Sequence, residues 1–138
     1  MRIKVPTSLK KQVAIRADKC CEYCLLPERV SFYSFHIDHI KSLKHGGLSD
    51  LQNLAYCCPD CNFHKGSDVG TFSANEKYLV RFFNPRNDIW SDHFLVEDGL
   101  ILGKTEIGQS TVQIFQFNEI DRLLFRRNLI SLRVYQAF

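Results

Sequence analysis

Long apolar runs are missing from this sequence of 138 residues. No stretch approaches the roughly 18 consecutive apolar residues that suggest a membrane-spanning helix, so we expect no association with a membrane. The N-terminal residues MRIKVPTSLKKQ are basic but lack the apolar segment of a secretory signal, and we therefore expect a cytoplasmic protein. A net charge of +3 is also too small to identify a partner by itself.

Internal repeats, low-complexity segments and a linker between two halves are equally absent from the sequence. A composition of 45% hydrophobic and 24% charged residues is ordinary for a globular protein. The length suffices for one hydrophobic core but would be marginal for two. We predict a single domain over residues 1–138, in which a core at 20–66 carries a C-terminal extension, 71–138, packed on it.

Cysteine, in contrast, is plentiful, with six residues in a short chain. Without a secretory signal, two C-x-x-C pairs favour a metal site over disulfides. Four thiolates complete the tetrahedral shell of zinc and leave no position for water, which makes such a site structural rather than catalytic. The predicted ligands are Cys21, Cys24, Cys58 and Cys61. Cys20 and Cys57 precede the two pairs and are interpreted as buried thiols outside the site.

Apolar spacing and turn residues predict an α+β order of elements around the cysteines. A helix is expected at 8–18, a strand at 31–40, a glycine loop at 45–50, a second strand at 53–58 and a helix from Pro59. Further along we expect a strand at 77–83, a turn at 84–88, a hairpin at 93–106 and a helix at 119–135. The segment 110–117 suits a short helix, although its β-branched content leaves a strand open. Asp98-Gly99 suits the tight turn of the hairpin.

A second group of polar residues lies between the two cysteine pairs and just after them. Asp38 and Asn62 offer a carboxylate and an amide oxygen to a hard divalent cation, with positions left for water and phosphate. His39 would then be free to act as a base. Asn62 stands near the start of a predicted helix, where phosphate is favoured, and Lys65 lies on the same helical face.

The stretches CEYC, FHIDHI and HGGLSDLQNLAYCCPDCNFHKG, within residues 20–66, resemble the HNH endonuclease family of the ββα-metal type with four zinc-binding cysteines. The resemblance implies a small zinc-stapled ββα-metal core, to which the chain adds an N-terminal helix and a C-terminal hairpin with helices. It further implies that His39 is the general base, that Asp38 and Asn62 hold a catalytic Mg²⁺ or Mn²⁺, and that Asn53 braces the loop that orients His39. Many members have histidine where this chain has Asn62, and His64 is the alternative ligand.

The same resemblance implies hydrolysis of DNA phosphodiester bonds, with DNA as the partner. The expected nucleic-acid contacts are Lys41, Lys44, Lys65 and Arg86. Arg86 belongs to the segment 82–94, which resembles a tail of small HNH proteins and would support the fold or touch DNA. The competing hypothesis is a zinc-stapled nucleic-acid-binding module without catalysis. Phosphate contacts carry no base information, so specificity would come from the C-terminal half, a second subunit of a homodimer or another partner.

Overall fold

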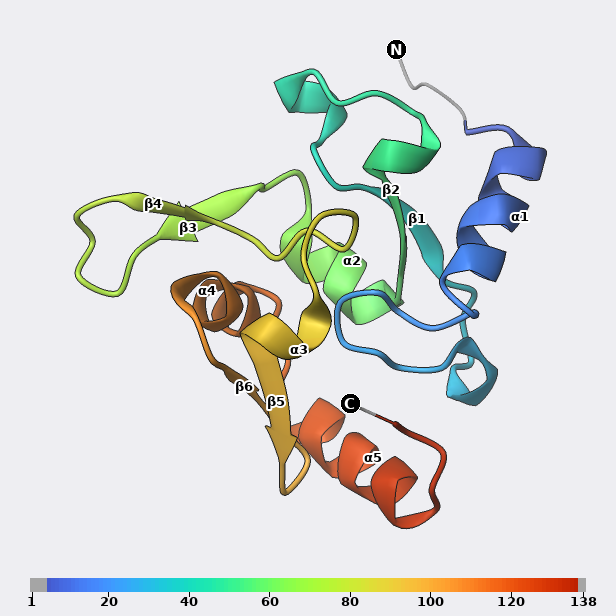
Figure 1. Cartoon of the computed structure of the whole chain (residues 1–138). Coiled ribbons are helices and arrows are strands. Elements are labelled where there is room, and N and C mark those ends of the chain that lie inside the picture. The colour runs from blue at the N-terminus through green and yellow to red at the C-terminus, as the bar shows by residue number, and fades with distance from the viewer. Residues whose placement is uncertain (1–4, 137–138) are drawn as a thin grey trace.

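An antiparallel hairpin followed by a helix occupies the middle of the chain in the computed structural model, which describes residues 5–136 (Figure 1). Strand β1 (His36–His39) pairs with β2 (Leu54–Cys57), and α2 (Pro59–Lys65) follows directly. Helix α1 (Thr7–Arg16) lies against β2, and α2 lies against β1. All four positions of β2 are buried. The predicted order of helix, strand, strand and helix is confirmed.

Strand β1 is shorter than the predicted 31–40. The backbone before it turns at Ser31, whose Oγ accepts a hydrogen bond from the amide of Tyr33 at 3.2 Å. The amide of Phe35 then donates to the carboxylate of Glu28 at 2.9 Å instead of to a strand partner. The β-branched and aromatic residues of this segment predicted too long a strand, because side-chain oxygens accept hydrogen bonds from backbone amides that a strand partner would otherwise bind.

The C-terminal half consists of two hairpins and three helices. Strands β3 (Gly70–Phe72) and β4 (Leu79–Arg81) form the first hairpin, and α3 (Trp90–His93) leads into the second, made of β5 (Phe94–Glu97) and β6 (Leu100–Gly103). Helices α4 (Glu106–Ile114) and α5 (Ile120–Ser131) complete the described chain. Asp98 and Gly99 form the predicted tight turn of the second hairpin, and their φ of 52° and 81° are typical of a type I′ turn.

The segment left open between helix and strand belongs largely to α4. The side chain of Thr105 accepts a hydrogen bond from the amide of Gly108 at 3.0 Å and so starts this helix four residues before the β-branched stretch. Strand β3 and the single turn of α3 were not predicted. Each has no more than four residues, too few to show a period in the sequence.

Aromatic side chains join the C-terminal half to the region of the first cysteine pair. The ring of Phe115, which follows α4, packs on Tyr23 at 5.0 Å and on Phe82 at 5.2 Å between centroids. The indole nitrogen of Trp90 donates to the carbonyl oxygen of Tyr23 at 2.8 Å. Tyr23 therefore lies where both halves of the chain meet. Among the described residues, no helix is long and apolar enough to cross a membrane.

Candidate functional site

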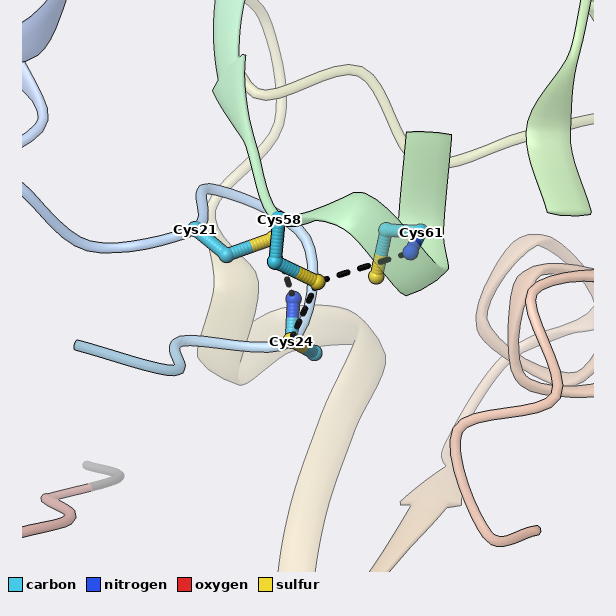
Figure 2. A group of neighbouring side chains, drawn as sticks. All are labelled: Cys21, Cys24, Cys58 and Cys61. Carbon is cyan, nitrogen blue, oxygen red and sulfur yellow. Dashed lines mark hydrogen bonds between the residues drawn. The ribbon is translucent and has the colours of Figure 1, made fainter. Parts of the chain in front are cut away.

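The four predicted zinc ligands converge at one buried point (Figure 2). Cys21 and Cys24 come from the loop after α1. Cys58 directly follows β2 and is the N-cap of α2, and Cys61 lies in the first turn of that helix. The sulfur atoms all lie within 4.8 Å of one another, and the Sγ atoms of Cys24 and Cys58 are 3.7 Å apart. With Zn–S bonds of about 2.3 Å, tetrahedral ligands stand about 3.8 Å apart. The donor set and its spacing therefore fit a tetrahedral zinc ion.

Both cysteine pairs form the same tight turn. The amide of Cys24 points to the Sγ of Cys21 at 3.5 Å, and the amide of Cys61 points to the Sγ of Cys58 at 3.4 Å. Leu25 closes the first turn with a φ of 66°. Backbone N–H groups aimed at sulfur favour the thiolate form that a metal requires.

The carboxylate of Asp38 lies inside the protein at the end of β1, with a side chain that is 5% exposed. One oxygen accepts a hydrogen bond from the Tyr23 hydroxyl at 2.6 Å, and the other accepts from the ammonium group of Lys65 at 3.1 Å. Lys65 also donates to the carbonyl oxygen of His39 at 3.0 Å. Burial raises the pKa of Asp38 above its usual value. Burial and the neighbouring carboxylate raise the pKa of Tyr23, so its hydroxyl keeps its proton and donates.

His39, the next residue, has its ring fixed by a different partner. Its Nε2 lies 2.8 Å from the Oγ of Ser49, in the glycine loop. Burial lowers the pKa of His39 below 6.5, against the opposite effect of the Asp38 carboxylate. The imidazole is therefore mostly neutral at pH 7, which is the protonation state of a base.

Asn53 closes the glycine loop with three hydrogen bonds. Its Oδ1 accepts from the amide of Lys41 at 2.8 Å, and its Nδ2 donates to the carbonyl oxygens of Lys41 and Leu48, both at 2.9 Å. Gly47 is needed beside this clamp, because a Cβ at that position would lie 1.7 Å from the carbonyl oxygen of Lys41. Asn53 thus fixes the segment that carries Ser49.

Asp38, His39 and Asn62 line one open cavity of about 270 Å³. Ser42 lines the same cavity and is 6% exposed, and its hydroxyl oxygen has no hydrogen-bond partner among the described residues. A carboxylate, an amide and a hydroxyl are oxygen donors of the kind that Mg²⁺ and Mn²⁺ prefer. The donor types of the cavity thus suit a hard divalent cation, and both oxygens of Asp38 already accept a hydrogen bond, one from Tyr23 and one from Lys65.

Comparison with known proteins identifies this part of the chain. Residues 21–68 match the family model described as HNH endonuclease. Those residues form an HNH endonuclease domain. The match covers both cysteine pairs, the hairpin of β1 and β2, and α2. It confirms the family that the sequence resembles, and the cysteine cluster agrees with the zinc-binding subtype.

A curated relative extends the likeness beyond the HNH domain. The chain is 28% identical over 124 residues to the Septu protein PtuB of Bacillus thuringiensis, covering 87% of this chain and 44% of the relative. The chain thus spans less than half the length of this relative. No solved structure matches.

The predicted nucleic-acid contacts of the HNH domain fall into two groups. Lys41 and Lys44 are exposed, and Lys44 borders the cavity. Lys65 is 2% exposed and engaged with Asp38. The side chain of Arg86 is 9% exposed, pairs with the carboxylate of Glu22 and donates to the carbonyl oxygen of Leu54 at 3.2 Å. The structure therefore places Lys65 and Arg86 inside the protein, where their charges hold other groups of the fold.

Sequence analysis did not identify several residues that hold the site together. These are Tyr23, which bonds to Asp38, and Ser49, which bonds to His39; Ser42, which lines the cavity, was not identified either. Ser49 lies in the glycine loop that was singled out, so its place in the chain was a usable signal. Tyr23 lies between Cys21 and Cys24, but its contact with Asp38 depends on how the cysteine turn packs against β1. That contact could not be predicted from spacing.

Proposed function

We propose that this protein is a metal-dependent endonuclease that hydrolyses DNA phosphodiester bonds. The observation that carries the proposal is the single open cavity of an HNH domain that Asp38, His39 and Asn62 line together. A base, two oxygen ligands and an open approach for a phosphodiester are the components that this hydrolysis needs. Lys44, which borders the cavity, and the exposed Lys41 supply positive charge for the DNA backbone.

His39 acts as the general base in this proposal. We assign the proton of the neutral ring to Nε2, which donates it to the Oγ of Ser49. Nδ1 then carries the free lone pair that accepts a proton from the attacking water. The lowered pKa of His39 keeps this lone pair available at neutral pH. Asn53 supports the arrangement indirectly, because it fixes the loop that presents Ser49.

Asp38 and Asn62 are the residues that would hold a catalytic Mg²⁺ or Mn²⁺. When bound, the ion stabilises the negative charge that develops on the phosphoryl and leaving oxygens. The Ser42 hydroxyl offers a further oxygen donor at the same cavity. Tyr23 and Lys65 fix the orientation of the Asp38 carboxylate. A structural zinc ion on the four cysteines would pin the start of α2, and with it Asn62, to the loop after α1.

Nicking of a supercoiled plasmid tests the proposal. Wild-type protein with Mg²⁺ or Mn²⁺ is expected to relax and linearise the plasmid, and His39→Ala is expected to lose about 10²- to 10⁴-fold of this rate, the usual contribution of a general base. His36→Ala is the matched control, because His36 lies exposed on the same strand. Equal rates for wild type and His39→Ala would overturn the assignment of the base. DNA binding without nicking by the wild type would favour the non-catalytic module instead.

A further inference from the structure

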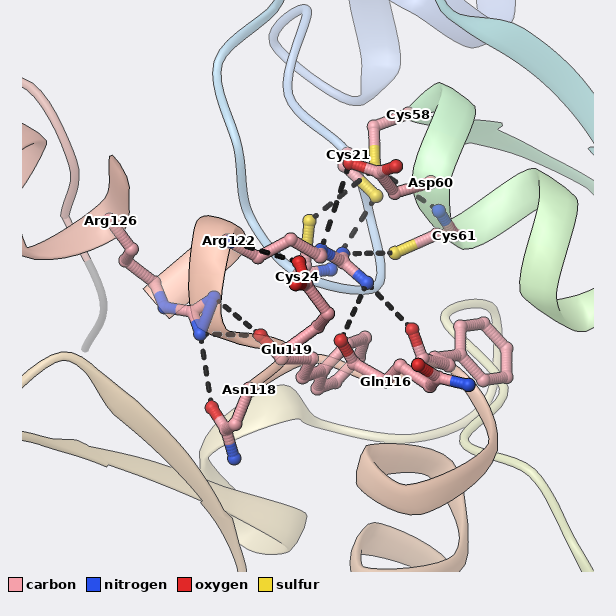
Figure 3. A network of polar contacts seen from close by, with 12 residues as sticks. Cys21, Cys24, Cys58, Asp60, Cys61, Gln116, Asn118, Glu119, Arg122 and Arg126 are labelled. Carbon is pink, nitrogen blue, oxygen red and sulfur yellow. Dashed lines mark hydrogen bonds and ion pairs between the residues drawn. The ribbon is translucent and has the colours of Figure 1, made fainter. Parts of the chain in front are cut away.

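Arg122 of helix α5 lies against the cysteine cluster, although it is far outside the matched residues 21–68 (Figure 3). Its Nη2 donates a hydrogen bond to the Sγ of Cys61 at 3.1 Å. The side chain of Arg122 is 10% exposed, so this contact lies largely out of solvent. The Asp60 carboxylate lies 3.9 Å from Nε and is 62% exposed, and the Glu119 carboxylate accepts a hydrogen bond from the backbone amide of Arg122 at 3.4 Å. Of these two side-chain contacts of the guanidinium group, the one with the buried Cys61 sulfur is the shorter.

Backbone acceptors hold the guanidinium group in this direction. Nη1 donates to the carbonyl oxygens of Phe115 and Gln116 at 2.6 and 3.1 Å. The group also lies over the ring of Phe117, 5.7 Å from its centroid. Because the two carbonyl oxygens fix Nη1 of the planar guanidinium group, its Nη2 is held in the direction of the Cys61 sulfur.

A second contact joins the same end of the chain to the other cysteine pair. The hydroxyl of Tyr135, just after α5, donates to the carbonyl oxygen of Cys24 at 2.9 Å. The segment from Arg122 to Tyr135 thus contacts one cysteine of each pair. Four thiolates around Zn²⁺ carry a net charge of about −2, which is costly to bury without a compensating cation. Arg122 is a buried cation at hydrogen-bond distance from one of these thiols.

We infer that Arg122 is a positioning residue of the zinc site, which orients the Cys61 thiolate, offsets part of the negative charge of the four thiolates and slows the release of zinc. The inference rests on the zinc assignment of the proposed function. Groups that hydrogen-bond to metal ligands typically change metal affinity about 10- to 100-fold when they are removed. The C-terminal helix is therefore part of the metal site of the HNH domain.

Zinc release from the full-length protein to excess chelator tests this role. Arg122→Met removes the charge and the donors but keeps an unbranched apolar stem, and we expect zinc to leave on the order of 10- to 100-fold faster. Arg126→Met is the matched control. Arg126 is also on α5, is 4% exposed and donates to the carbonyl oxygens of Gly99 and Phe117, and none of its described hydrogen bonds reaches a cysteine. Rates are compared at temperatures equally far below the melting midpoint of each variant.

Two results of this comparison would overturn the inference. If Arg122→Met releases zinc at the wild-type rate, the contact with Cys61 does not hold the metal. Equal acceleration by Arg126→Met would assign the effect to the docking of α5 in general. The zinc content of purified wild type is measured first, since a protein without zinc would refute the zinc assignment itself and the inference with it.

Cobalt substitution gives a readout that a merely structural role of Arg122 would not move. A hydrogen bond to a thiolate stabilises its lone pairs, so its loss should shift the thiolate-to-cobalt charge-transfer band to longer wavelength. We expect this shift in Arg122→Met and not in Arg126→Met. If Arg122→Met does not fold, Arg122→Lys carries the test, because a lysine nitrogen ends short of the position of Nη2. An unchanged band in the folded variant would contradict the inference.

Discussion

Replacing Lys65 by methionine tests the buried ion pair beneath the proposed active site. The Lys65 ammonium and the Asp38 carboxylate lie 3.1 Å apart, and the two side chains are 2% and 5% exposed. The substitution keeps most of the apolar stem but leaves the carboxylate inside the protein with the Tyr23 hydroxyl as its remaining donor. Removing one partner of a buried pair usually costs about 3–5 kcal/mol. Because the Tyr23 contact persists, we expect a loss of about 3 kcal/mol in the free energy of unfolding.

Urea unfolding of zinc-loaded protein measures this loss. The series consists of wild type, Lys65→Met, Asp38→Asn and the double variant. Each single substitution leaves one buried charge without its partner, and the double substitution leaves none. The loss in free energy of unfolding of the double variant should therefore be smaller than the sum of the two single losses by about 2 kcal/mol or more. Lys44→Met, at an exposed lysine, should stay within about 0.5 kcal/mol of wild type. Additive losses, or a Lys65→Met variant as stable as the control, would refute the pairing.

The pH dependence of the Lys65→Met variant gives an independent check. Burial already raises the pKa of Asp38, and loss of the ammonium group should raise it further. A carboxyl group whose pKa is higher in the folded than in the unfolded protein does not lower the free energy of unfolding below its unfolded pKa of about 3.9. The loss grows as the pH rises from that value to the folded pKa and is complete above it. The deficit of Lys65→Met should therefore be small near pH 4 and full at neutral pH. A constant deficit would contradict a charge effect.

Three further predictions concern the base, its loop and the metal. Burial lowers the pKa of His39, and the base is lost only when its ring is protonated, so the rate of cleavage should fall as the pH drops below 6.5. A rate that rises toward acid pH would contradict this. Ser49→Ala should reduce the rate less than His39→Ala does, because Ser49 only orients the ring. Asn53→Ala removes three hydrogen bonds and should cost about 2 kcal/mol in thermal unfolding, against little change for the exposed Gln52→Ala. Cys58→Ser should lower both the melting temperature and the zinc content, whereas chelator should destabilise wild type more than this variant; equal effects would argue against structural zinc.

Local patterns in the sequence predicted the parts of the fold that depend on near neighbours. The cysteine spacing identified all four members of the cluster, because a metal shell imposes its own geometry on the chain. Asp98-Gly99 identified the turn of the second hairpin, because both positions need a positive φ that other residues tolerate poorly. The same logic failed at 31–40, where the Glu28 carboxylate captures a backbone amide that strand propensity does not take into account.

The surroundings of the site could not be predicted in the same way. Asp38 and His39 are neighbours in sequence, yet Tyr23 and Lys65 hold one while Ser49 holds the other. Each partner comes from a different segment and reaches β1 through the packing of the cysteine turn, α2 or the glycine loop. Positive charge was ambiguous for the same reason. The identity of a lysine or arginine does not show whether its side chain faces solvent, as in Lys44, or a buried carboxylate, as in Lys65.

Arg122 extends this point to the boundary of the domain. The family match ends at residue 68, but Arg122, the buried cation beside the cysteine cluster, lies on α5. Phe115 packs on the ring of Tyr23, which lies between Cys21 and Cys24, and Trp90 donates a hydrogen bond to its carbonyl oxygen. The likeness to the Septu protein PtuB covers 124 residues and therefore reaches well past the match. A metal core of this size buries little apolar surface by itself, so its stability depends on the elements packed around it. The C-terminal half supplies both that packing and the charge opposite the thiols, which makes it part of the HNH site in physical terms although it lies outside the motif.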